Sequence, residues 1–203
     1  MYTPRFNQVS DRGLLIEAMR AWSFAILVGP ATPAPLMATH LPLVVKDEGP
    51  HGLLEGHFAR ANRHWQSLAG HSVLAVFSGP HSYISPSLYV DPLSVPTWNY
   101  IAVHAYGSLE LIEDEAAKET LLAELIHSHE PAYWEKWRAM PDDFRGSMLA
   151  EIVGFRILIQ RIEGKFKLSQ NRDAIERGNV QAACASGTAD QQALAAWMAR
   201  LAG

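Results

Sequence analysis

Cationic and hydrogen-bonding side chains gather around one glycine in residues 161–172 (RIEGKFKLSQNR). In an extended chain, alternate side chains point to the same side, so Lys165 and Lys167 converge while Phe166 and Leu168 face inward. Two converging ammonium groups suit a single anion such as a phosphate. A hairpin edge protected by solvated lysines accounts for the same pattern equally well. The segment therefore predicts either an anion site or a protected strand edge.

A second candidate anion site lies in residues 56–62 (GHFARAN), where an apolar strand gives way to a helix. An arginine beside free backbone N–H groups at a helix start is a common phosphate site, which makes Arg60 and Asn62 candidates. His57 would line the wall of such a site. The alternative for a lone histidine is a half-buried ring satisfied by backbone groups, and that role is the commoner one.

Two further segments carry side chains suited to a ligand. Thr39 and His40 form a polar pair in an apolar strand, which favours either a strand that faces a ligand or a turn before Pro42. Residues 79–89 and 95–100 are dense in aromatic rings, hydroxyls and prolines. Rigid aromatic loops offer a large contact area at low entropic cost, so they suit a planar ligand or a subunit interface.

Metal and nucleophile chemistry has little support. Residues 127–130 (HSHE) lack the HExxH spacing, and side chains two positions apart face different ways on a helix, so we expect a polar helix end. Cys184 has no basic neighbour to lower its thiol pKa and is expected to be a small packing residue. Ser85 and Ser87 lack the GxSxG context of a hydrolase. We predict no metal site and assign no catalytic residue.

The elements that position these residues follow from hydrophobic periodicity. Alternation is clearest in residues 99–112, which predicts one long half-buried antiparallel strand. The remaining predicted strands are residues 22–28, 36–45, 53–58, 73–77 and 155–162, and the predicted helices follow Ser10-Asp11, span 61–69, and follow the caps Asp114 and Thr188. Five or six strands with short helices at their ends favour a closed or half-closed antiparallel barrel over a doubly wound sheet.

Composition limits the class of protein. The 203 residues include 17 Lys plus Arg against 21 Asp plus Glu, so the formal charge is −4 and no overall positive field attracts nucleic acid. The one cysteine cannot form an intrachain disulfide, and no apolar run is long enough to cross a bilayer. We expect a cytoplasmic protein with no membrane partner, and a single domain over residues 1–203.

Several strings are shared with a known family: residues 1–4 (MYTP), 39–42 (THLP), 56–57 with 61–62, 79–86 (GPHSYISP), 95–100 (VPTWNY) and 164–172 (GKFKLSQNR). Over nearly its full length the sequence resembles the PaiB-type proteins, which are described as FMN-binding negative transcriptional regulators. The last two strings are long and specific. One departure is Leu88, where the family usually has Trp, and this weakens any stacking role at that position.

The resemblance implies a split β-barrel of the pyridoxamine-phosphate-oxidase type, mainly β with inserted helices (α+β), an N-terminal helix and a C-terminal helical segment. It also implies a homodimer with FMN in two equivalent clefts between subunits. Arg60 and Asn62 would lie on the phosphate side, with His57 in the wall of the site. Thr39, His40 and Leu41 would form the strand under the isoalloxazine ring. Lys165 and Lys167 would close the same cleft, from either subunit.

Three functions remain open. The first is a flavin-binding protein, with FMN supporting a weak oxidoreductase activity. The second is a transcriptional repressor, although the sequence has no helix-turn-helix, zinc-finger or RRM signature and only a local basic patch for DNA. The third is a haem-binding split barrel, with His40, His57 and His81 as candidate axial ligands.

Overall fold

The computed structural model describes residues 1–201, which divide into two compact units. Unit 1 contains Met1–Leu15, Ser78–Val103 and the chain from Glu163 onward, and unit 2 contains Ile16–Phe77 and His104–Ile162. Three long strands and the first α-helix contribute residues to both units.

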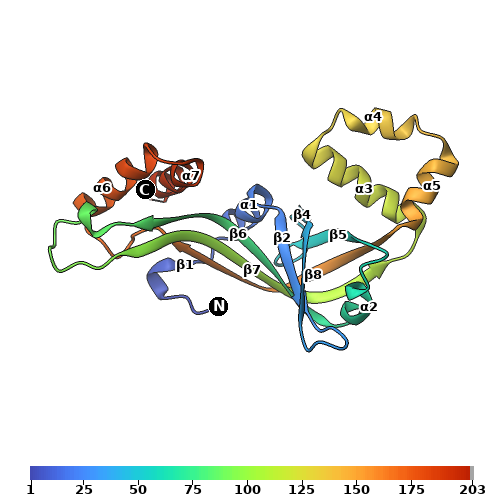
Figure 1. Cartoon of the computed structure of the whole chain (residues 1–203), viewed down its shortest axis with the longest axis horizontal. Helices are drawn as coiled ribbons and strands as arrows, with labels where there is room; N and C mark the ends of the chain where they lie inside the picture. The colour runs from blue at the N-terminus through green and yellow to red at the C-terminus, as the bar shows by residue number, and fades with distance from the viewer. Residues whose placement is uncertain (202–203) are drawn as a thin grey trace. The chain divides into compact units, whose positions relative to one another are not determined.

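The strands form an 8-stranded sheet in the order β3-β2-β6-β7-β8-β5-β4, with β1 paired to β8 (Figure 1). The pairs β1–β8, β2–β3, β2–β6, β4–β5 and β5–β8 are antiparallel. The bounds are β1 Gln8–Val9, β2 Phe24–Gly29, β3 Met37–Pro42, β4 Val44–Lys46, β5 Leu53–Ala59, β6 Ser72–Ile84, β7 Thr97–Ile112 and β8 Ile152–Lys167. The predicted antiparallel, sheet-rich α+β fold is confirmed.

The core of unit 2 follows from alternation along its strands. Leu54 and Phe58 lie four residues apart on the buried face of β5. The centre of the Phe58 ring lies 4.9 Å from the centre of the Phe155 ring on β8. The strand order ends at β3 and β4, yet only the buried Leu43 separates these two strands in sequence. Because the two ends of the order are neighbours along the chain, the sheet curls around this core.

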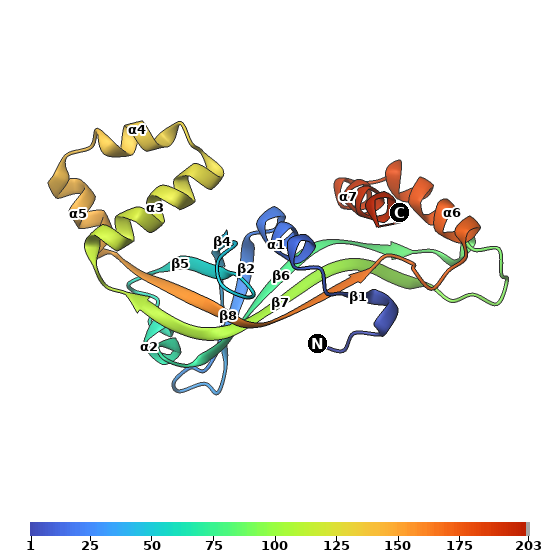
Figure 2. The same ribbon diagram turned by 180° about the vertical axis from the view of Figure 1, so that it is seen from behind.

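Along the chain, α-helices lie between the strands and after the last strand (Figure 2). Their bounds are α1 Arg12–Ala21, α2 His64–Leu68, α3 Glu115–His129, α4 Tyr133–Arg138, α5 Asp142–Ala150, α6 Ala174–Ala185 and α7 Ala189–Arg200, with 3-10 turns η1 Arg5–Asn7 and η2 Pro86–Leu88. The predicted caps are confirmed: the Asp114 carboxylate accepts from the Ala117 N–H, and Thr188 forms a capping box with Gln191. Within residues 1–201, no helix has both the length and the apolar character that crossing a membrane requires.

Several predicted bounds were wrong. The sheet has eight strands rather than five or six, and the run 36–45 divides at Leu43 into β3 and β4. The helix predicted for 61–69 begins only at His64, and β8 continues to Lys167. The strand predicted for 73–77, before Gly79-Pro80, continues as β6 to Ile84. Since β2 pairs with β6 only at Leu74–Val76, Pro80 lies outside that pairing, where the missing N–H is tolerated. Helices α4, α5 and α6 were not predicted.

Candidate functional site

A hydrogen-bonded group of side chains joins β3 to the loop before α2, within unit 2. The Thr39 hydroxyl lies 2.9 Å from Nδ1 of His64 and accepts from the Asn62 amide at 3.4 Å. Oδ1 of Asn62 accepts from the His64 backbone N–H at 3.2 Å. We call Thr39, Asn62, Arg63 and His64 the β3–α2 cluster. Since Thr39 pairs with Leu27 of β2, the cluster is anchored to the sheet.

The cluster combines a neutral core with a free cation. His64 is only 3% exposed, and this burial lowers the pKa of its imidazole, an effect that the Gly29 and Pro30 carbonyls partly offset. Arg63 directly precedes His64 and is exposed, and within residues 1–201 its guanidinium makes no hydrogen bond or ion pair. Arg63 and His64 were not among the predicted site residues, although both follow Asn62 directly in the chain.

Arg60 has a different set of partners. Its Nε donates to the Ala150 carbonyl, its Nη2 donates to the Ile152 carbonyl at 3.0 Å, and its backbone N–H donates to the Glu151 carbonyl at 2.7 Å. Arg60 therefore clamps the junction between α5 and β8. It lies four residues before α2, so the prediction that it stands at a helix start was wrong.

Large apolar side chains of β2, of β3 and of the residue before β3 are exposed. Leu41 is buried, whereas His40 is exposed and its ring lies 6.3 Å from that of Phe24 on β2. Phe24, Leu36 and Met37 are large apolar side chains that remain 67%, 65% and 42% exposed. Phe24 lies opposite Pro42 and Met37 lies opposite Gly29, so these two side chains are at opposite ends of the β2–β3 pair. The edge of β3 is open, because β3 is the terminal strand of the sheet order.

His57 lies on β5, opposite Gly154 of β8. Its Nδ1 is buried with no hydrogen-bond partner, and burial lowers the pKa of its imidazole. A neutral ring with an unpaired nitrogen can accept or donate one hydrogen bond according to its tautomer.

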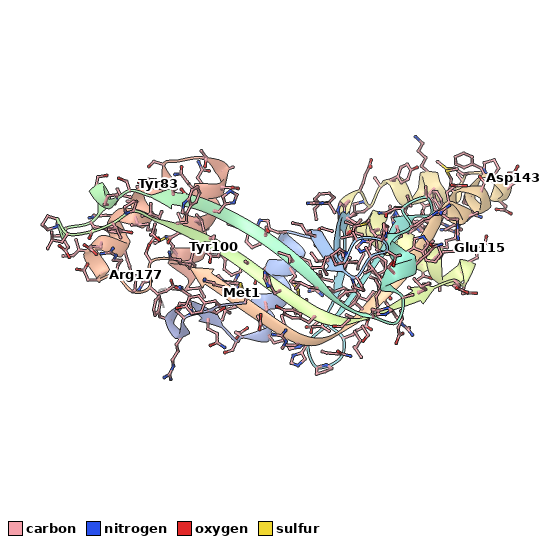
Figure 3. The ribbon with its side chains drawn as sticks, turned by 60° about the horizontal axis from the view of Figure 1, so that its bottom comes forward. Met1, Tyr83, Tyr100, Glu115, Asp143 and Arg177 are labelled. Atoms are coloured by element: carbon pink, nitrogen blue, oxygen red, sulfur yellow. The ribbon has the colours of Figure 1, made fainter. Side chains whose placement is uncertain are left out.

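The predicted lysines line a pocket of about 390 Å³ in unit 1. Lys165 Nζ donates to the Tyr2 carbonyl at 3.1 Å and lies 5.5 and 5.3 Å from the ring centres of Tyr2 and Tyr100. Lys167 donates to the Thr97 hydroxyl. Figure 3 labels Tyr100 on β7 and Met1 at the start of the chain, which locate this region. We call this recess the tyrosine–lysine pocket.

The eight predicted site residues thus fall into two groups. Unit 2 holds Thr39, His40, Leu41, His57, Arg60 and Asn62, and unit 1 holds Lys165 and Lys167. Lys165 lies opposite Gln8 of β1. This pairing argues against the alternative that Lys165 protects a free strand edge.

Two other predictions were confirmed. Residues 127–130 end α3 as a polar helix terminus. Cys184 is 2% exposed inside α6, and burial raises the pKa of its thiol. Among residues 1–201, no group of three His, Cys, Asp or Glu side chains could hold a metal ion.

Comparison with known proteins identifies the family. A family model described as "Putative FMN-binding domain" matches residues 1–161. The chain is 38% identical over 185 residues to "Protease synthase and sporulation protein PAI 2" of Bacillus subtilis (strain 168), covering 89% of this chain and 87% of that protein. FMN, the predicted cofactor, is thus supported at the level of the family.

Solved structures support the fold. The flavocytochrome Anf3 from Azotobacter vinelandii matches with a TM-score of 0.67 at 19% identity, covering 87% of this chain and 78% of that one. The FAD and heme binding protein from Mycobacterium smegmatis matches with a TM-score of 0.64 at 16% identity, covering 90% and 81%. These likenesses confirm the predicted split-barrel fold. The chain belongs to the FMN-binding split-barrel family that includes PAI 2.

Proposed function

We propose that this protein binds FMN at the β3–α2 cluster and acts as a flavin-dependent regulator. The observation that carries the proposal is the family match over residues 1–161, because that range contains Thr39, Asn62, Arg63 and His64. FMN supplies one- and two-electron redox chemistry when it is bound. The chain's own residues bind and orient it.

The donors present fit a flavin phosphate. Arg63 is free to form charge-assisted hydrogen bonds, and the Asn62 amide has a second N–H beyond the one given to Thr39. Neutral His64 holds the Thr39 hydroxyl in place. Arg60 keeps some N–H groups for an anion, but two of its nitrogens already serve backbone carbonyls.

The isoalloxazine ring would lie along β3. Met37 is 42% exposed and shares a side of β3 with Thr39, so it offers apolar contact area next to the phosphate donors. His40 and Phe24 offer aromatic area on the other side of the β2–β3 pair. His57 is assigned to the wall of this site, where its unpaired Nδ1 would accept or donate one hydrogen bond.

These exposed apolar side chains support a homodimer. Exposed apolar side chains on and beside a terminal strand are typical of an interface, and a second copy would cover the flavin from the open side. We further propose that the chain is one domain, since β6, β7 and β8 contribute to both units, and that it is cytoplasmic. Light scattering tests the dimer, and Phe24→Lys is expected to yield monomers.

Regulation is proposed to run through the flavin and a protein partner rather than through direct DNA contact. The formal charge of −4 disfavours non-specific attraction to DNA. A gel shift on a defined operator that persists at physiological salt would contradict this part of the proposal.

The test of flavin binding is a visible absorption scan before and after incubation with FMN and gel filtration. We expect retained flavin at about one per subunit, and about tenfold or greater weakening of FMN affinity in Arg63→Ala, as for a lost charge-assisted hydrogen bond. Riboflavin, which lacks the phosphate, should bind both proteins alike. Arg138→Ala, another exposed arginine of unit 2, is the control. A colourless protein that gives no calorimetric heat with FMN would refute the proposal.

A further inference from the structure

We propose that the tyrosine–lysine pocket of unit 1 is a second ligand site, separate from the flavin site, and that it takes a mononucleotide 5′-phosphate. This inference goes beyond flavin binding, and it replaces the expectation from the sequence that Lys165 and Lys167 close the flavin cleft. The pocket cations Lys165, Lys167 and Arg172 all lie outside residues 1–161, the range that the FMN-binding family model matches.

The charge of the pocket favours an anion. Within residues 1–201, neither Lys165 nor Lys167 has a carboxylate partner, and no Asp or Glu side chain lines the recess. Each ammonium group has three N–H donors and gives one of them, to the Tyr2 carbonyl and the Thr97 hydroxyl respectively. Two donors on each lysine therefore remain for a phosphate. The third cation, Arg172, is already paired with Glu176 at 3.3 Å.

The walls of the pocket favour a planar ring. Tyr2, Tyr89 and Tyr100 line it, together with Phe6 and Pro96. Tyr89 is itself stacked by Arg172, whose Cζ lies 3.8 Å from the ring centre. Any base can stack on an aromatic side chain, because every base has a π-face. A volume of about 390 Å³ lies at the lower end of the range for small-molecule sites, which suits a mononucleotide.

A buried acceptor in the lining calls for a hydrogen-bond donor on the ligand. Asn7 is 3% exposed, and its Oδ1 is buried with no partner. A buried oxygen that accepts no hydrogen bond lowers the stability of the protein, so a ligand that donates a hydrogen bond to it is favoured. The exocyclic amino group or ring N–H of a base would supply that bond.

The site rests on rigid elements. Lys165 is fixed in β8 by pairing with Gln8. Just after β8, Ser169 adopts φ 62° and is held by two hydrogen bonds with the fully buried Asn99, from Asn99 Nδ2 at 2.9 Å and to Asn99 Oδ1 at 3.2 Å. Both residues line the pocket. A buried polar pair that holds a residue in the left-handed region is a typical sign of a preorganised site.

The experiment uses FMN-loaded protein and calorimetric titration with AMP, UMP and the uncharged nucleoside adenosine. We expect both nucleotides to bind and adenosine to bind at least tenfold more weakly. Lys165→Met with Lys167→Met should weaken AMP at least tenfold while the retained FMN stays unchanged. Lys136→Met is the matched control, because Lys136 also lies over a tyrosine ring, at 5.8 Å from Tyr133. Asn7→Leu is a second variant that leaves both cations in place.

The outcomes separate this site from the flavin site. Failure of both nucleotides to bind, equal AMP affinity in the double lysine variant, or displacement of FMN by AMP would overturn the inference. Loss of FMN from the double lysine variant would also overturn it, since the pocket would then be part of the flavin site. AMP binding to a protein that takes up no flavin would support this site and refute the proposed function instead.

Discussion

Gly107→Ala is expected to destabilise unit 2 strongly. Gly107 lies in β7, and a Cβ built there would be 2.3 Å from the Leu158 carbonyl oxygen and 2.7 Å from Cγ2 of Ile157. The first neighbour is backbone of β8, so no rotamer change relieves the overlap. Overpacking of this kind costs about 3 kcal/mol at the upper end of its usual range. For a chain of this size, that lowers Tm by roughly 6 to 12 °C.

Thermal unfolding followed by circular dichroism measures this effect. Gly146→Ala is the matched control in the same unit, because Gly146 lies inside α5 and its Cβ would meet only the end of Glu115 at 3.7 Å. Alanine should raise stability there by about 0.5 to 1 kcal/mol, since glycine has the greater entropic cost in a helix. A Gly107→Ala protein that melts within about 1 °C of the parent would refute the close approach of β7 and β8.

Three further effects are expected. Because burial raises the pKa of Cys184, its thiol should react with a thiol reagent only after denaturant is added, and rapid labelling of the folded protein would contradict this. Burial lowers the pKa of His57 below 6.5, so its stabilisation is complete above pH 6.5 and is lost as pH falls toward the folded pKa; His57→Gln should flatten the fall of urea midpoint below that pH. Asp114→Ala should cost about 1 kcal/mol of unfolding free energy, and an unchanged midpoint would argue against the α3 cap.

The parts of the fold that the sequence predicted well are governed by local physics. The alternation in residues 99–112 predicted β7, because a half-buried strand needs one apolar side chain in every two. Asp114 and Thr188 predicted helix starts, because a side-chain oxygen there accepts from a backbone N–H two or three residues on. These signals depend on neighbours in sequence, so no knowledge of the tertiary structure was needed.

The missed elements depend on distant partners. Helix α4 has only six residues and no side-chain cap, and Trp137 is its one buried residue. Because proline has no backbone N–H, Pro80 predicts the end of a strand when it is considered alone. In the structure β6 continues past Pro80, and β2 pairs only with an earlier part of that strand. Neither fact can be obtained from a local window of sequence.

For the candidate sites as well, the type of each residue could be known from the sequence, but its hydrogen-bond and strand partners could not. Arg60 was a good phosphate candidate by type, yet its guanidinium serves the carbonyls of Ala150 and Ile152, about ninety residues later in the chain. Lys165 was equally consistent with a protected strand edge until its pairing with Gln8 was known. Residue type therefore identified some cations that can bind anions, whereas only the folded partners determine which cations of the chain remain free to do so. By that criterion the available charge lies on Arg63 in unit 2 and on Lys165 and Lys167 in unit 1, and these are the residues on which the flavin and nucleotide proposals depend.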